Sequence, residues 1–122
     1  MTEVAEARAR AKYIRTSAQK AKLVLDTIRG KSAGEALATL KFSKKGVAHA
    51  VEKTLRSAIA NAVHAADRDG KRRLDEDDLY VKSCYADRGP IAKRVRPAPM
   101  GRAYRIQKRT AHLTVCVAER EK

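Results

Sequence analysis

Two consecutive stretches near the start of the chain place apolar residues at the i, i+3, i+4, i+7 spacing of a helix with one buried face. The first follows Ser17, a residue type that caps helix N-termini, and ends before Gly30, which favours the left-handed conformation that stops a helix. The second follows Ser32, with Glu35 three residues later as in a capping box. The apolar positions are Ala21, Val24, Leu25 and Ile28 in the first helix and Ala33, Ala36, Leu37 and Leu40 in the second.

A third and longer apolar pattern of the same period predicts a helix that starts near Ser43 and runs to Asp69 and Gly70. Many of its residues are small, which permits close packing against a sheet. The stretch 67–78 that follows is crowded with charges of both signs and has no periodicity, so it predicts a solvated loop. The apolar positions of this helix are Val47, Val51, Leu55, Ala58, Ile59, Ala62 and Ala66.

Alternation of apolar with polar residues predicts three strands. From Val4 to Tyr13, small or apolar residues alternate with basic ones, which is typical of an edge strand with one basic face. The segments 79–86 and 110–117 alternate in the same way, and we expect both to be half buried. The order is therefore strand, three helices and two strands, and 122 residues suffice for one domain with one core.

The segment between the last two strands, from Ala86 to Arg109, has a different composition. It holds eight Lys or Arg against one acid, Asp87, and its glycines and prolines discourage helix. It has no apolar face to bury. An arm of about nine residues at roughly 3.3 Å each extends about 30 Å, well beyond a domain of this size. Such an arm needs a partner to order it.

The charge of the chain points to a polyanionic partner. Lys and Arg number 28 against 14 Asp plus Glu, a formal net charge of +14, of which +7 lies in 86–109 and +7 in 8–31. Nucleic acid is the expected polyanion, bound with a salt slope of roughly 0.7 to 0.9 per phosphate contact. No run of about 18 apolar residues and no apolar signal-peptide core occurs, so we expect no membrane partner and a cytoplasmic location.

Residues that could carry chemistry do not form a recognisable site. The acidic run Asp75–Asp78 lacks the ligand pattern of a calcium loop, and no GxGxxG, phosphate-loop or GxSxG motif occurs. We expect no metal, no cofactor and no catalytic residues, and two reduced, structural thiols. The histidines and cysteines considered are His49, His64, His112, Cys84 and Cys116.

Basic side chains in the two charged regions are the candidate RNA contacts. Arginine can fork onto phosphate oxygens or stack on an unpaired base, and backbone at Gly and Pro can approach RNA closely. Tyr104 either stacks on a base or packs against the protein. The candidates in the arm are Arg88, Lys93, Arg94, Arg96, Arg102 and Arg105, with Lys108 and Arg109 at its base, and those near the N-terminus are Arg8, Arg10, Lys12, Arg15, Lys20 and Lys22.

Three segments together resemble one family. SAQKAKLVLDTIRGK, SAIANA and GPIAKRVRPAPMGRAYRIQKRTAHLTV, in this order and at these separations, are similar to the twenty-second protein of the bacterial large ribosomal subunit. The resemblance covers nearly the whole chain. It implies an α+β fold with a three-stranded antiparallel sheet packed on three helices, and a long protruding basic β-hairpin at about 86–106.

The resemblance also implies a function. The protein would be a structural, non-enzymatic constituent of the ribosome, monomeric there, that binds and bridges several domains of 23S rRNA during assembly. It would lie beside other ribosomal proteins near the tunnel exit, with its hairpin tip facing the nascent peptide. The chain departs from the commoner pattern at PAPMGRAYR, which puts contacts of the tip in doubt, and around 68–78. The implied tunnel-lining tip residues are Gly89, Pro90, Ile91, Ala92, Lys93, Arg94, Val95 and Met100.

Two other interpretations remain open from the residues alone. An architectural DNA-binding protein could use a basic ribbon of this kind in a groove of the duplex, and preference for duplex DNA would favour it. A small RNA-acting enzyme would need Asp75–Asp78 and His112 to converge in one cleft near the hairpin.

Overall fold

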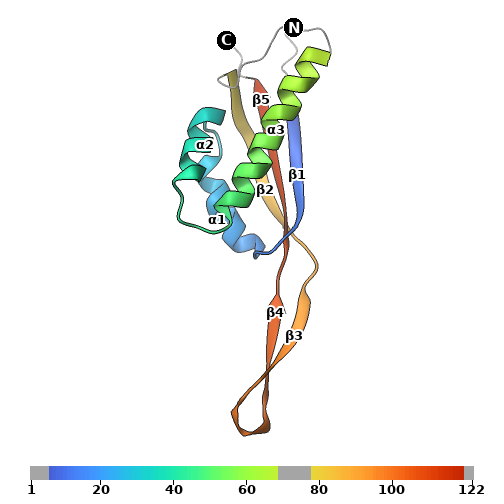
Figure 1. The fold of residues 1–122 in the computed structure, drawn as a ribbon. Helices are drawn as coiled ribbons and strands as arrows, with labels where there is room; N and C mark the ends of the chain where they lie inside the picture. Colours follow the sequence, from blue (N-terminus) through green and yellow to red (C-terminus); the bar gives the residue numbers. More distant parts are fainter. Residues whose placement is uncertain (1–5, 69–77, 120–122) are drawn as a thin grey trace.

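A three-stranded antiparallel sheet with helices on one face forms the body of the protein (Figure 1). The structure, a computed structural model, describes residues 6–68 and 78–119. Strand β5 (Ala111–Glu119) lies in the centre, between β1 (Glu6–Ile14) and β2 (Leu79–Arg88). The predicted α+β class, the three-stranded sheet and the edge position of the first strand are confirmed; the expected start of that strand at Val4 lies outside the described residues.

Helix α1 (Ala18–Ile28) forms where the sequence predicts it. The Ser17 side chain caps it by accepting a hydrogen bond from the Lys20 backbone N–H at 3.3 Å. All four predicted apolar positions are buried, and Gly30 follows with φ +82°. The first helix is therefore defined by local signals that the structure bears out.

Helix α2 (Ala33–Lys41) is capped in the same way, because Ser32 Oγ accepts from the Glu35 N–H at 3.4 Å. Helix α3 (Ala48–Arg68) begins later than predicted. The Ser43 hydroxyl accepts from the Lys45 N–H at 3.4 Å, which holds a turn before the helix rather than its first turn. The predicted end at residues 69 and 70, and most of the predicted charged loop, lie outside the described residues.

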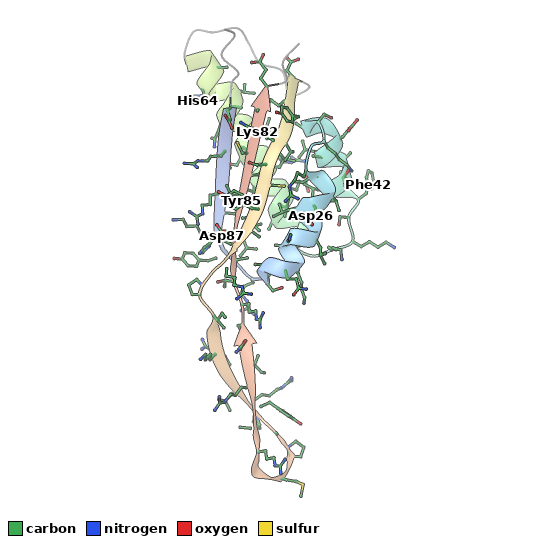
Figure 2. All side chains as sticks on the ribbon, turned by 180° about the vertical axis from the view of Figure 1, so that it is seen from behind. Asp26, Phe42, His64, Lys82, Tyr85 and Asp87 are labelled. Atoms are coloured by element: carbon green, nitrogen blue, oxygen red, sulfur yellow. The ribbon has the colours of Figure 1, made fainter. Side chains whose placement is uncertain are left out.

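The core lies between the sheet and the helices. Leu113, Val115 and Val117 of β5 are fully buried against Leu25 of α1 and Leu55 of α3. Burial of each such side chain contributes about 1.5–3 kcal/mol. The three helices all pack on this face, so the opposite face of the sheet is left without a helix; Figure 2 shows Lys82, Tyr85 and Asp87 on that side.

A second, two-stranded sheet projects from the end of the body (Figure 1). Strand β3 (Ala92–Pro97) pairs antiparallel with β4 (Ala103–Lys108), and a short 3₁₀ turn, η2 (Pro99–Gly101), joins them. Met100 and Gly101 have φ of +63° and +72°, and the Ala98 N–H donates to the Arg102 carbonyl at 2.9 Å. We call residues 92–108 the hairpin.

Candidate nucleic-acid interface

The hairpin carries cations on both of its faces. Residues directly opposite each other in an antiparallel ladder point to the same face. Arg94 and Arg96 of β3 therefore lie on one face, opposite Ile106 and Tyr104, whereas Arg105 lies with Val95 on the other. The remaining hairpin cations are Lys108 on the first face, Lys93 on the second and Arg102 beside the turn.

Side chains of the hairpin are exposed almost throughout. Val95, Met100 and Tyr104 are 72%, 96% and 61% exposed, so the packing alternative for Tyr104 is wrong within the isolated chain. From residue 88 to residue 109 there is no Asp or Glu to neutralise the basic groups. A two-stranded ribbon without a core is marginally stable by itself. The hairpin is thus a charged ribbon whose surface is available to a partner.

Contacts at the base tie the hairpin to the body. The Gly89 N–H donates to the Thr110 carbonyl at 2.9 Å, and the Thr110 hydroxyl donates to the Pro90 carbonyl at 2.7 Å. A side chain at position 89 would meet Thr110 Oγ1 at 2.5 Å, so the close approach requires glycine. Gly89, Pro90, Ile91 and Ala92 therefore lie at the end of the hairpin opposite its turn, whereas the resemblance implies a place at the tip. We call residues 88–91 with 109–112 the hinge.

The N-terminal strand also reaches the hinge. Tyr13 adopts φ +60°, and its N–H donates to His112 Nδ1 at 3.0 Å. The two rings meet edge to face with centroids 5.0 Å apart. His112 is therefore engaged in a structural contact, and this gives no support to a catalytic role for it.

Two of the expected RNA contacts, Arg88 and Arg109, converge beside the start of α1. They line a cavity of about 170 Å³ together with Ser17 and Gln19. Arg109 also donates to the Gln107 side chain at 3.3 Å. The arrangement places the cations of the hinge beside the N-terminal end of α1.

The remaining expected cations lie on the body and differ in their exposure and in whether an acid lies close to them. Arg8 and Arg10 flank the buried Ala9, so they project from the helix-free face of the sheet. Arg10 Nη2 lies 3.9 Å from Asp87 Oδ2, which partly neutralises it. Lys12 on β1 and Lys22 on α1 are exposed, and Arg15 and Lys20 line a groove at the end of β1.

Sequence reasoning missed a basic residue of this groove. Lys45 lines it together with Arg15 and Lys20, although it comes from the segment before α3. The adjacent pair Lys44 and Lys45 is visible in the sequence, but only the path of the chain shows which of them faces the groove.

One further cation, Arg29, is held by contacts within the protein. Arg29 donates to Asp26 Oδ1 at 2.6 Å and to the Cys84 carbonyl at 2.8 Å, tying α1 to β2. Its hydrogen bond to Asp26 raises the pKa of the guanidinium further. We therefore do not count Arg29 among the RNA contacts.

The two thiols are free, and each donates a hydrogen bond. Cys84 Sγ donates to the Leu25 carbonyl at 3.3 Å, and burial raises the pKa of this thiol. Cys116 Sγ donates to Glu6 Oε1 at 3.3 Å; burial and then the carboxylate raise its pKa. Thiols with a raised pKa are poor nucleophiles at neutral pH.

The described part of the chain holds neither a metal-binding cluster nor a membrane-spanning helix. Within 6–68 and 78–119 no three His, Cys, Asp or Glu side chains are grouped closely enough to hold a metal ion. The acidic run expected at 75–78 lies almost wholly outside those residues. None of the described helices is both long and apolar enough to cross a membrane.

Fold and surface together define a class: a small basic α+β protein with an exposed cationic ribbon and a cationic body. Residues 9–118 match the family model "Ribosomal protein L22p/L17e". The chain belongs to this family of structural ribosomal proteins, which agrees with the prediction from the residues and with the expectation that it is not an enzyme.

Relatives match over most of the chain. A "Large ribosomal subunit protein uL22" of Solibacter usitatus (strain Ellin6076) is 52% identical over 116 residues, 95% of this chain and 98% of that protein. One of the same description from Desulfitobacterium hafniense (strain DSM 10664 / DCB-2) is 47% identical, over 95% of this chain and 96% of that protein. One from Koribacter versatilis (strain Ellin345) is 49% identical, over 92% of this chain and 66% of that protein.

Proposed function

We propose that this protein is a structural constituent of the large ribosomal subunit that binds and bridges domains of 23S rRNA and lines the nascent-peptide exit tunnel with its hairpin. The observation that carries the proposal is the exposed hairpin, which has cations on both faces and no acid between residues 88 and 109. Family membership supports the ribosomal setting, because relatives are described as large-subunit proteins.

Bridging follows from the separation of two basic surfaces. The hairpin holds Lys93, Arg94, Arg96, Arg102 and Arg105, whereas the body holds the cations of β1 and α1. Each six-residue strand spans about 20 Å, so the turn lies far from the body. RNA segments that contact the two surfaces are therefore held at a fixed spacing by one protein.

The tunnel-lining part of the hairpin is its distal half. Val95 leads towards the turn, where Met100 is 96% exposed. Lys93 and Arg94, which pair with Gln107 and Ile106, lie in the half of the hairpin nearer its base. An apolar group between cations suits a surface that borders RNA on one side and a passing peptide on the other. The other proposed partners are neighbouring ribosomal proteins near the tunnel exit, and the protein acts as a monomer bound to cytoplasmic ribosomes.

Sedimentation of cell lysate through sucrose at moderate and then high salt tests this proposal. We expect the full chain to comigrate with large subunits under both conditions, because many phosphate contacts and an enclosed hairpin oppose release. Recovery of the protein as a free species, or with chromosomal DNA, would refute the ribosomal function; the latter would support the DNA-binding alternative.

A further inference from the structure

An open groove of about 660 Å³ lies at the end of β1, at the end of the body that carries the hinge. Its apolar lining includes Ile14, Leu23 and Val47, and its charged side chains are Arg15, Lys20 and Lys45. No acidic residue lines it. The volume is within the range of roughly 300–1,000 Å³ that is typical of sites for small molecules.

Three elements build the groove. At the end of β1 the chain turns sharply, and the Thr16 N–H donates to the Ile14 carbonyl at 2.8 Å. Helix α1 then supplies Lys20 and Leu23 on one side, while the segment leading into α3 supplies Lys45 and Val47 on the other. The groove is therefore formed by the fold and not by one mobile loop.

Leu23 shows that the groove is left open in the isolated chain. The buried face of α1 consists of Ala21, Val24, Leu25 and Ile28, and Leu23 lies beside this face with 54% of its surface exposed. A leucine this exposed, among basic side chains, offers apolar contact to a ligand that is itself anionic. A nucleotide combines these properties, since its base is a flat, largely apolar group attached to a phosphate.

We propose that the groove receives an unpaired nucleotide of the bound RNA, with the base against Leu23 and Val47 and the flanking phosphates beside Arg15, Lys20 and Lys45. This inference rests on the proposed function and specifies a contact within it. Proteins read RNA mainly through unstacked bases of loops and bulges, which fit such a groove, whereas paired bases do not. The site gives Lys45 a role in RNA binding that the sequence did not indicate.

Methyl resonances of the full-length protein report directly on the groove. We would titrate it with a single-stranded RNA tetranucleotide, with an abasic tetranucleotide of equal charge, and with an acidic peptide that contains leucine. We expect the RNA to shift the methyl signals of Ile14, Leu23 and Val47, and the abasic strand to shift them far less. Larger shifts with the peptide than with RNA would overturn the inference in favour of a protein partner.

Matched variants separate the contribution of the groove to RNA binding from the contribution of overall charge. Lys45→Gln should weaken binding of the tetranucleotide about two- to fivefold and lower the salt slope by roughly 0.7. Lys44→Gln removes the same charge from the neighbouring residue, which does not line the groove, and should have a smaller effect. Leu23→Gln should weaken binding more than Phe42→Gln, a change at a side chain that is 80% exposed outside the groove (Figure 2).

The results also test the nucleotide site and the proposed function separately. RNA binding without shifts in the groove, or equal effects of Lys45→Gln and Lys44→Gln, would overturn the nucleotide site and leave the proposed function standing. Absence of the protein from large subunits in sucrose would refute the proposed function, and the nucleotide site with it.

Discussion

Replacing Gly89 with alanine would place a methyl group against Thr110 in the hinge. Gly89 does not adopt a left-handed backbone conformation, so alanine is compatible with its φ and the effect is purely steric. The added Cβ would lie 2.5 Å from Thr110 Oγ1 and 3.2 Å from a ring carbon of His112. Real Cβ atoms do not approach other atoms this closely, so the threonine side chain must move.

The magnitude follows from the hydrogen bonds that this movement disturbs. Rotation of the Thr110 hydroxyl breaks its 2.7 Å bond to the Pro90 carbonyl. Displacement of the backbone also strains the 2.9 Å bond from the Gly89 N–H to the Thr110 carbonyl. Each such bond contributes about 0.5–1.5 kcal/mol, so we expect Gly89→Ala to lower the free energy of unfolding by about 1–3 kcal/mol.

Urea unfolding of the full chain measures this loss, and Gly46→Ala is the matched control. No atom lies within 4 Å of a Cβ at Gly46, and its φ is not positive, so that change should be neutral or stabilise by up to about 1 kcal/mol. Amide hydrogen exchange should show that protection in the hairpin falls more in Gly89→Ala than protection in α3.

A double-mutant cycle tests the cause. Thr110→Ala removes the hydroxyl that an alanine at position 89 would meet. In that background Gly89→Ala should therefore cost at least about 1 kcal/mol less than it does in the wild-type protein. An equal cost in both backgrounds would show that the close contact with Thr110 is not why glycine is required.

Three other predictions concern the hairpin, an ion pair and the thiols. Replacing residues 93–107 by Asn-Gly, a turn that joins the paired neighbours Ala92 and Lys108, should leave the circular dichroism of the body intact. It should lower the salt slope of RNA binding by about 3.5 to 4.5, because it removes the cations of this segment. An unfolded product would contradict this prediction. The hydrogen bond from Lys82 lowers the pKa of Glu6. The stability that this interaction adds is present above the ordinary glutamate pKa and is lost as the pH falls through the lowered pKa. Glu6→Gln should therefore remove this part of the acid dependence of urea unfolding. Thiol labelling followed by mass spectrometry should find Cys84 and Cys116 slow to react at neutral pH in the folded protein, and rapid labelling without denaturant would refute the burial argument.

Local signals in the sequence were sufficient to predict much of the secondary structure of the body. Ser17, Ser32 and Gly30 act within a few residues of their own positions, so capping rules locate α1 and α2. Alternation identified the buried face of β5 because its period depends only on the strand itself. The start of α3 was misjudged because Ser43 can accept a hydrogen bond in a turn as well as at a helix N-terminus.

Features of the candidate site that depend on distant contacts could not be predicted. Gly89 and Pro90 look like turn residues, and only their hydrogen bonds with Thr110, across the ladder, place them at the base of the hairpin. Lys45 lines the groove together with Lys20, although helix α2 lies between them in the sequence. The sequence shows that a cation is present, but the tertiary structure determines whether its side chain faces solvent, an acid or a groove.

Division of roles between hinge and hairpin explains how one short chain can hold RNA in a defined geometry. Ordering a flexible segment costs about 1–2 kcal/mol per residue in backbone entropy. The paired residues of β3 and β4, from Ala92–Lys108 to Pro97–Ala103, already restrict the backbone of the hairpin. Part of the entropy cost of ordering it therefore arises before RNA binds. Hydrogen bonds from arginine to phosphate contribute about 1.5–3 kcal/mol each and can supply the rest. The hinge therefore sets the direction in which the hairpin leaves the body, and RNA completes its order along its length. It follows that a change at Gly89 should impair the orientation of the hairpin, whereas loss of single cations such as Arg96 should weaken its attachment without altering that direction.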